Sequence, residues 1–287
     1  MRVNLLRFCG VGVLMVGVAG LGQVVAGPAA GADAGLAAAQ RLVGKALFLR
    51  GFYVSDELSY DSAGKVIGSP KKDEWTVAAV DVMKVSRKGP KEIELEGLRA
   101  AVRYNVDQHL FERHVQKDEK VKILVADAGV GVPGDAKGLE AAFGAMFAVG
   151  IDPGLQRAMP EFWRHYFDPA VEWPADGLSG VTVYPSLGLT NQPRDLTAPQ
   201  VQHKVEAKMT SFAERDRLQG NMLLRIVVDA EGVPRRIYVV RPLGYGMEER
   251  GVEAVAKWRF TPAMKDGKAV AAGVVVQLDF AFVAQRR

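Results

Sequence analysis

Hydrophobic and polar residues alternate most regularly near the C-terminal end of the chain, between residues 220 and 282. From Met222 to Val228 every second residue is apolar, and the same holds from Val274 to Phe282. A period of two places alternate side chains on opposite faces, so both runs predict half-buried β-strands. Ile237 to Arg241 predicts a further strand between them, which Pro242 ends.

Turn and helix signals separate these strands. Asp229-Ala-Glu-Gly232 predicts a hairpin turn, because glycine adopts the left-handed conformation and aspartate accepts from backbone amides two residues on. Apolar residues at three- and four-residue spacing predict a helix from Met247 to Trp258. Asp266-Gly267 predicts the last turn. If the helix carries the chain back along the sheet, the last strand pairs antiparallel beside the first, in the order second, first, third. The second and third strands are then edges.

Two runs of residues resemble the C-terminal domain of TonB proteins: Gly220-Asn-Met-Leu-Leu-Arg-Ile-Val-Val-Asp-Ala-Glu-Gly232 and Ala256-Lys-Trp-Arg-Phe-Thr-Pro262. The resemblance extends over residues 190–284. It implies a small α+β domain that binds a short peptide, the TonB box of an outer-membrane receptor, as an added strand. It does not imply an enzyme.

Strand patterns also dominate residues 40–128, which predict a β-rich antiparallel domain of unknown role. Trp75 to Arg87 and Glu92 to Arg103 predict two long strands, and the apolar phase of the second slips by one after Gly97, which suggests a β-bulge there. Asn105 to Lys117 is interpreted as a helix before another strand at Val121 to Val125.

Residues 129–169 predict a helical connector. It contains a helix from Leu139 to Val149, an Asp152-Pro153 helix start and an aromatic segment, Trp163 to Phe167, which favours core packing. Residues 170–200 resemble a Pro/Gly-rich linker, and 201–287 form the C-terminal domain. The predicted fold class is α+β: a β-rich antiparallel N-terminal domain, a helical connector and a small TonB-like domain with a three-stranded antiparallel sheet and a helix.

The N-terminal segment has the composition of an export signal. Residues 1–26 combine Arg2 and Arg7 with an uncharged run and a small-residue cleavage site, which predicts a signal peptide and a periplasmic protein. An uncleaved inner-membrane anchor at residues 8–26 is the alternative, and residues 27–39 are a tether. Cys9 is the single cysteine, so no disulfide is expected. The formal net charge of +4 favours no nucleic-acid partner.

None of the candidate catalytic, cofactor or metal motifs in the sequence is interpreted as a functional site. Gly129-Val-Gly-Val-Pro-Gly134 spells a dinucleotide-like pattern, but Pro133 interrupts it and no helix follows directly. The four histidines, His109, His114, His165 and His203, have no metal-ligand spacing and are expected to be surface or interfacial residues. We therefore predict no catalytic, cofactor-binding or metal-binding residues, and no enzyme.

The remaining functional signal is the edge of the last strand, where main-chain groups could bind an extended peptide. The predicted peptide-binding residues are Gly273, Val274, Val275, Val276, Gln277, Leu278, Asp279 and Phe280. The predicted partner is a peptide segment of an outer-membrane TonB-dependent receptor, in TonB-dependent transport. Alternatively, the edge is covered by residues 170–200 or by a second copy in a homodimer.

Two departures from the family concern energy coupling: the chain has no long proline-rich spacer, and its N-terminal segment lacks the serine and histidine of an energised anchor helix. Two other functions therefore remain open. One is a periplasmic scaffold or adaptor without energy coupling, and the other is a carrier of a small ligand in the N-terminal β-rich domain.

Overall fold

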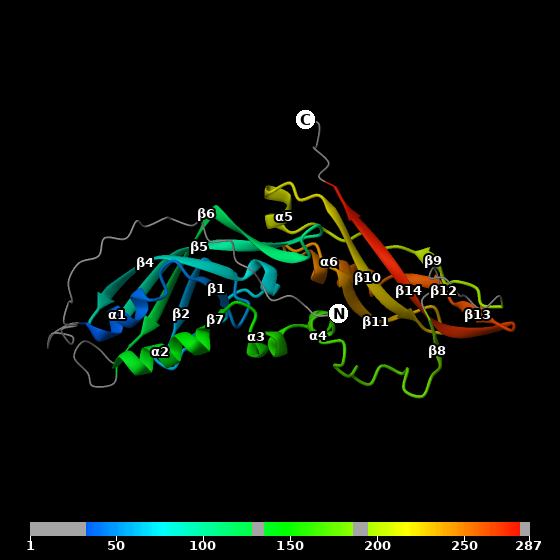
Figure 1. Cartoon of the computed structure of the whole chain (residues 1–287), viewed down its shortest axis with the longest axis horizontal. Helices are drawn as coiled ribbons and strands as arrows, with labels where there is room; N and C mark the ends of the chain where they lie inside the picture. Colours follow the sequence, from blue (N-terminus) through cyan, green and yellow to red (C-terminus); the bar gives the residue numbers. More distant parts are fainter. Residues whose placement is uncertain (1–32, 128–134, 186–194, 282–287) are drawn as a thin grey trace, which may run out of the picture. The chain divides into compact units, whose positions relative to one another are not determined.

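The computed structural model describes residues 33–127, 135–185 and 195–281, and these fall into two compact units (Figure 1). The N-terminal unit is built from residues up to Lys72, from Ala78–Ala100 and from Val115–Gly150. The C-terminal unit takes Asp73–Val77, Ala101–His114 and the chain from Ile151 onward. The signal segment and the glycine-rich motif lie outside the described residues, and the domain bounds given above stay predictions.

The N-terminal unit contains one mixed sheet. Its strands, in the order β3-β2-β6-β5-β4-β1-β7, are β1 Ala46–Leu49, β2 Glu57–Tyr60, β3 Val66–Ile67, β4 Ala79–Gly89, β5 Glu92–Asn105, β6 Leu110–Ala126 and β7 Phe147–Val149. The expected antiparallel arrangement holds for β1 with β4 and for β4 with β5, but β2 and β6 are parallel. The long connection between β2 and β6 permits this, because it returns the chain to the same end of the sheet.

Two helices pack together in this unit, α1 Ala34–Gln40 and α2 Asp135–Met146. Leu139, Phe143 and Met146 of α2 join the core formed by buried strand residues. The predicted helix over 139–149 is wrong at its end, since Phe147–Val149 is strand β7 and pairs with β1. Pairing with the free side of β1 outweighs the helical pattern there.

The irregularity predicted at Gly97 is present, but the extra residue lies in the partner strand. Val82 pairs with Gly97 and Lys84 with Glu96, so the bulge is at Met83 of β4. The side chain of Arg99 lies on the core-facing side of β5, like those of Ile93 and Leu95, and is fully buried. Its guanidinium donates to the carbonyl of Tyr53 at 2.8 Å and to that of Ser55, and burial lowers the pKa of Arg99 to about 10.

The helix expected over 105–117 is wrong, because these residues form the turn between β5 and β6 and the start of β6. The Asn105 side-chain oxygen accepts from the amides of Asp107 and Gln108, both at 3.0 Å, and His109 has a φ of 54°. This local bonding of an asparagine side chain competes with helix formation.

The main sheet of the C-terminal unit confirms the predicted strand order. Its order is β11-β10-β14-β13, and β8 also pairs with β14: the bounds are β8 Val183–Tyr184, β10 Gly220–Val228, β11 Pro234–Arg241, β13 Ala263–Lys265 and β14 Lys268–Phe280. The β10–β11 turn also forms as predicted. The Asp229 carboxylate accepts from the amides of Glu231 at 3.1 Å and Val233 at 2.8 Å, and Gly232 has a φ of 79°.

Shorter elements complete this unit: a 3₁₀ helix at Trp75–Val77, α3 Pro153–Ala158, α4 Glu161–Phe167, β9 Gln200–His203, α5 Ser211–Arg215, α6 Met247–Val255 and β12 Arg259–Thr261, which pairs with β9. Asp152 caps α3 with proline in its first turn, as predicted.

Trp163 is fully buried, and its ring lies 5.2 Å from that of Trp75 and 6.0 Å from that of Phe111. The predicted core packing of this aromatic segment is confirmed for Trp163.

Candidate functional site

The segment Gly273–Phe280 of β14, here called the β14 margin, is where the sequence predicts peptide binding. One side pairs with β10 throughout, from Phe280 opposite Gly220 to Gly273 opposite Val227. On the other side, β13 pairs with Lys268–Val270 and β8 with Ala271 and Ala272. Every second residue of an antiparallel strand directs its N–H and C=O away from its partner. In the described part of the chain, the outward groups of the β14 margin therefore have no strand partner.

Side chains of the β14 margin alternate between a buried and an exposed face. Val276, Leu278 and Phe280 are buried, whereas Val275 is 41% exposed. On the exposed face the Gln277 amide donates to the Asp279 carboxylate at 2.8 Å. The margin thus combines outward main-chain groups with one apolar and two polar side chains that a bound strand could contact.

Helix α6 supports the buried face of this sheet. Gly251 lies so close to it that a Cβ at this position would be 2.8 Å from the Met222 side chain and 3.0 Å from that of Leu278. Met222 and Leu278 are paired residues of β10 and β14 and are buried. Close packing on one face holds the strand backbone in place, which lowers the entropy lost when another strand is added.

The expected cover of the edge by residues 170–200 is limited among the described residues. Val183 and Tyr184 pair with Ala271 and Ala272 in parallel, next to the β14 margin rather than on it. Residues 186–194 lie outside the described part of the chain.

The N-terminal end of α6 is capped by residues from far away in the sequence. The Thr76 hydroxyl accepts from the amide of Gly246 at 2.8 Å, and the Glu74 carboxylate accepts from the amide of Glu249 at 2.9 Å. Gly246, the residue at the helix cap, has no side chain that could do this. The absence of a local cap was the one sequence signal that could have indicated a distant partner.

A second buried carboxyl group lies beside this cap. Glu248 is fully buried, and one of its oxygens accepts from the amides of Leu243 and Gly244, the latter at 2.7 Å. Burial raises the pKa of Glu74 and of Glu248, and the negative charge of Glu248 raises that of Glu74 further. The pair therefore retains a proton at pH values where exposed glutamates have lost theirs.

The histidines do not assemble into a site. His109 and His203 are exposed and His114 is half-buried, whereas His165 is buried with its ring stacked 3.6 Å from that of Trp173. The predicted surface or interfacial position is wrong for His165, because stacking on an indole offsets the cost of burying the ring. Over residues 33–127, 135–185 and 195–281, no group of three or more His, Cys, Asp or Glu side chains is arranged to hold a metal ion. In the same ranges no helix has the length and apolarity needed to cross a membrane.

Comparison with known proteins places the C-terminal region in context. Residues 211–282 match the family model described as Gram-negative bacterial TonB protein C-terminal. The curated relative Protein tonB2 of Pseudomonas aeruginosa is 34% identical over 79 residues, which are 27% of this chain and 29% of the relative. The chain therefore spans less than a third of that relative's length. The solution structure of the Pseudomonas aeruginosa TonB C-terminal domain matches 33% of this chain and 93% of its own, at 20% identity and a TM-score of 0.26.

Proposed function

We propose that this chain, whose residues 211–282 are a TonB C-terminal domain, binds a peptide segment of an outer-membrane receptor as a strand added to the β14 margin. The relatives support a TonB-like role in transport across the cell envelope. The observation that supports peptide binding by strand addition is the pairing of the β14 margin. It pairs with β10 on one side and has no described strand partner on the other.

The chemistry of this binding is strand addition without catalysis. Main-chain hydrogen bonds supply affinity for any extended peptide, and alternate side chains supply selectivity. A peptide residue that faces Val275 gains from apolar contact, and one that faces Gln277 and Asp279 gains from hydrogen bonding. The role stays one of docking, either in energy coupling or as a periplasmic adaptor.

A carrier function of the N-terminal unit has less support. The core of its sheet and helices is filled by apolar side chains such as Leu47, Ile93 and Ile123, each at most 1% exposed. No observation in the described residues favours a ligand site among these side chains, so the carrier function stays a prediction.

Disulfide trapping tests the docking proposal. Single cysteines replace Val275 and Gln277 in a chain with Cys9→Ser, and synthetic peptides span the periplasmic N-terminal segments of TonB-dependent receptors from the same organism, each with one cysteine. We expect cross-links at both positions, with efficient peptide cysteines spaced two residues apart, because residues alternate between faces along a strand.

Val240→Cys is the matched control. Val240 is 39% exposed, against 41% for Val275, but it lies in β11 at the opposite edge of the sheet. Equal trapping at Val240→Cys, or efficient trapping without the two-residue period, would contradict strand addition at the β14 margin.

A further inference from the structure

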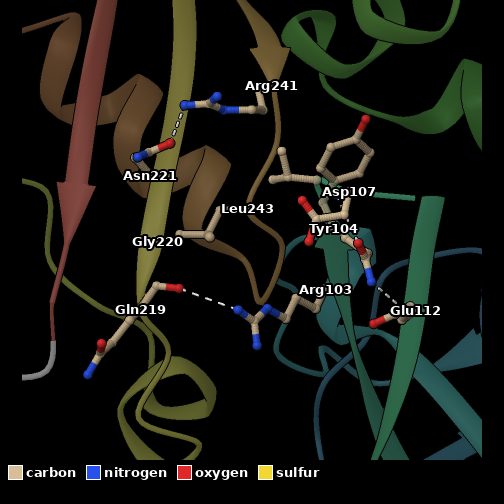
Figure 2. A pocket seen from close by; sticks show the side chains of 11 residues that line it. Arg103, Tyr104, Asp107, Glu112, Gln219, Gly220, Asn221, Arg241 and Leu243 are labelled. Carbon is tan, nitrogen blue, oxygen red and sulfur yellow. Dashed lines mark hydrogen bonds between the residues drawn. The ribbon is translucent and has the colours of Figure 1, made fainter. Parts of the chain in front are cut away.

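A polar cavity of about 500 Å³ lies in the C-terminal unit, near the start of β10 and the end of β11 (Figure 2). Gly220, Asn221 and Arg241 line it from these strands, and Arg103 and Asp107 line it from the end of β5 and the turn that follows. The β14 margin contributes none of the lining residues, so this cavity is separate from the proposed docking edge.

Backbone hydrogen bonds hold the two walls of the cavity together. The amide of Tyr104 donates to the carbonyl of Leu243 at 3.0 Å, and the amide of Tyr245 donates to that of Val102 at 2.9 Å. Between these bonds, Gly244 has a φ of 93°, and a Cβ there would be 2.1 Å from the Val102 oxygen. The cavity is therefore formed before any ligand arrives, which favours binding of a small molecule.

Two guanidinium groups line this cavity without an acidic partner. Arg241 donates to the Asn221 side-chain oxygen, and its Nε is buried with no hydrogen-bond acceptor. Arg103 makes one long contact, 3.5 Å, with the carbonyl of Gln219. In the described residues no ion pair joins either arginine to a carboxylate, although guanidinium groups are well suited to bind one through two hydrogen bonds.

Acidic groups line the hairpin side of the same cavity. Figure 2 shows Asp107 and Glu112 on this side and Arg241 with Asn221 on the sheet side. Glu112 already accepts from the Asn105 amide at 2.8 Å and lies 3.8 Å from the His114 ring, which leaves Asp107 as the less engaged acid. A simple anion would be repelled by these carboxylates, whereas a ligand with both charges could satisfy both walls.

We propose that this cavity binds a small zwitterion of the class of free amino acids and di- or tripeptides. Its carboxylate lies between Arg103 and Arg241, and its ammonium group lies at Asp107. The cavity volume falls within the range that holds a small organic ligand.

Calorimetric titration of the full chain with triglycine at pH 7 tests this proposal. Two blocked probes, N-acetyl-triglycine and triglycine amide, each lack one terminal charge. We expect triglycine to bind, and each blocked probe to bind about tenfold more weakly, because each loses one charge-assisted contact.

Two variants assign the ends of the ligand to the walls. With Asp107→Asn the preference for triglycine over N-acetyl-triglycine should shrink, and with Arg103→Gln the preference for triglycine over triglycine amide should shrink, because each variant removes one of the charges that the corresponding end of the ligand contacts. Both side chains are exposed, so these variants are expected to fold. Lys257→Gln, which removes one charge from an exposed residue outside the cavity, should change neither preference.

Three outcomes would overturn the proposal: no binding of triglycine at millimolar concentration, equal binding of N-acetyl-triglycine to the unchanged chain, or the same loss of binding in Lys257→Gln. None of them bears on disulfide trapping at the β14 margin, which reports on a different strand. Failure of the zwitterion site and failure of strand addition are therefore distinguishable.

Discussion

Two buried carboxyl groups, Glu74 and Glu248, link the stability of the C-terminal unit to pH. Burial raises the pKa of both, so the folded chain holds protons that the unfolded chain releases near pH 4 to 5. Their stabilising contribution is complete below the unfolded pKa and is lost as pH rises toward the folded pKa. Each retained proton makes the free energy of unfolding fall by about 1.4 kcal/mol per pH unit in this window.

The substitution Glu248→Gln tests this linkage. Glutamine keeps an oxygen for the amides of Leu243 and Gly244, and it can donate to Glu74 without a titrating group. We expect the fall in the free energy of unfolding between pH 5 and pH 8 to become shallower, and we expect the variant to be more stable than the unchanged chain at pH 8. Urea denaturation at several pH values measures both.

Glu253→Gln is the control for this experiment. Glu253 lies in the same helix, but its side chain is 55% exposed and 3.7 Å from Arg250. Its removal should leave the pH dependence almost unchanged. If Glu248→Gln shows the same slope as the unchanged chain, the pair does not retain a proton in the folded state.

Single residues also mark where the sequence was least informative. The apolar residues after Gly97 predicted a slip of phase that would leave Arg99 on the exposed face, where charged residues are normally found, but Arg99 is buried. Its burial depends on the carbonyls of Tyr53 and Ser55, which are more than 40 residues away in the chain. His165 similarly depends on Trp173. The pattern of neighbouring residues in the sequence does not indicate these contact partners of Arg99 and His165.

Among the elements, the β10–β11 hairpin turn provides a test of close backbone packing. Gly232 and Gly267 both have positive φ, 79° and 76°. A Cβ on Gly232 would be 1.9 Å from the Phe260 carbonyl oxygen, whereas a Cβ on Gly267 would meet nothing within 4 Å. We expect Gly267→Ala to cost about 1 kcal/mol for the backbone strain and Gly232→Ala to cost clearly more.

Urea denaturation of the two alanine variants compares these costs. The Gly267→Ala variant isolates the strain of the left-handed conformation, so the difference between the variants reports the clash with β12. Equal destabilisation would mean that β12 moves away from the turn without a significant loss of stability.

At the level of elements, local periodicity predicted what depends on local residues. The alternation in β10 and β14, the Asp229 turn and the strand order are confirmed, because each follows from side chains a few positions apart. The recognition of a TonB C-terminal domain is confirmed for residues 211–282. β8, β9 and β12 were missed, since such short strands are defined by distant partners. The helix over 105–117 failed for a local reason, because the Asn105 side chain bonds to the amides of Asp107 and Gln108 in the turn before β6.

At the scale of the whole molecule, the C-terminal unit depends on segments from the first half of the sequence. Asp73–Val77 supplies the caps of α6, and Ala101–His114 pairs with the chain at Leu243 and Tyr245. We expect a fragment of residues 201–287 to be less stable than the same residues in the full chain. Hydrogen exchange at the β10 amides measures this difference.

Thr76→Val in the full chain is the corresponding single-site test. It removes the hydroxyl that accepts from Gly246 and donates to Glu74, so we expect a loss of about 1 kcal/mol, typical of a helix cap. Amide exchange in the 201–287 fragment as slow as in the full chain would show that the C-terminal strands do not need these segments.

The candidate site could be predicted in part. The edge strand follows from the order of the sheet, and the placement of Gly273–Phe280 beside β10 agrees with it, while peptide binding itself stays a prediction. The cavity between Arg103 and Arg241 could not be anticipated, because its walls are 138 residues apart in sequence and meet through backbone pairing at Gly244 that no local pattern indicates.

The position of β8 has a consequence for selectivity. Val183 and Tyr184 run parallel to β14 and occupy the same side of it that a docked peptide would use. If a peptide docks at the β14 margin as proposed, β8 would block its pairing with β14 at Ala272, so this chain would set one end of the added strand. A peptide extended past that end would gain no further main-chain hydrogen bonds with β14 there, so peptides that differ only beyond it would be distinguished by their side chains.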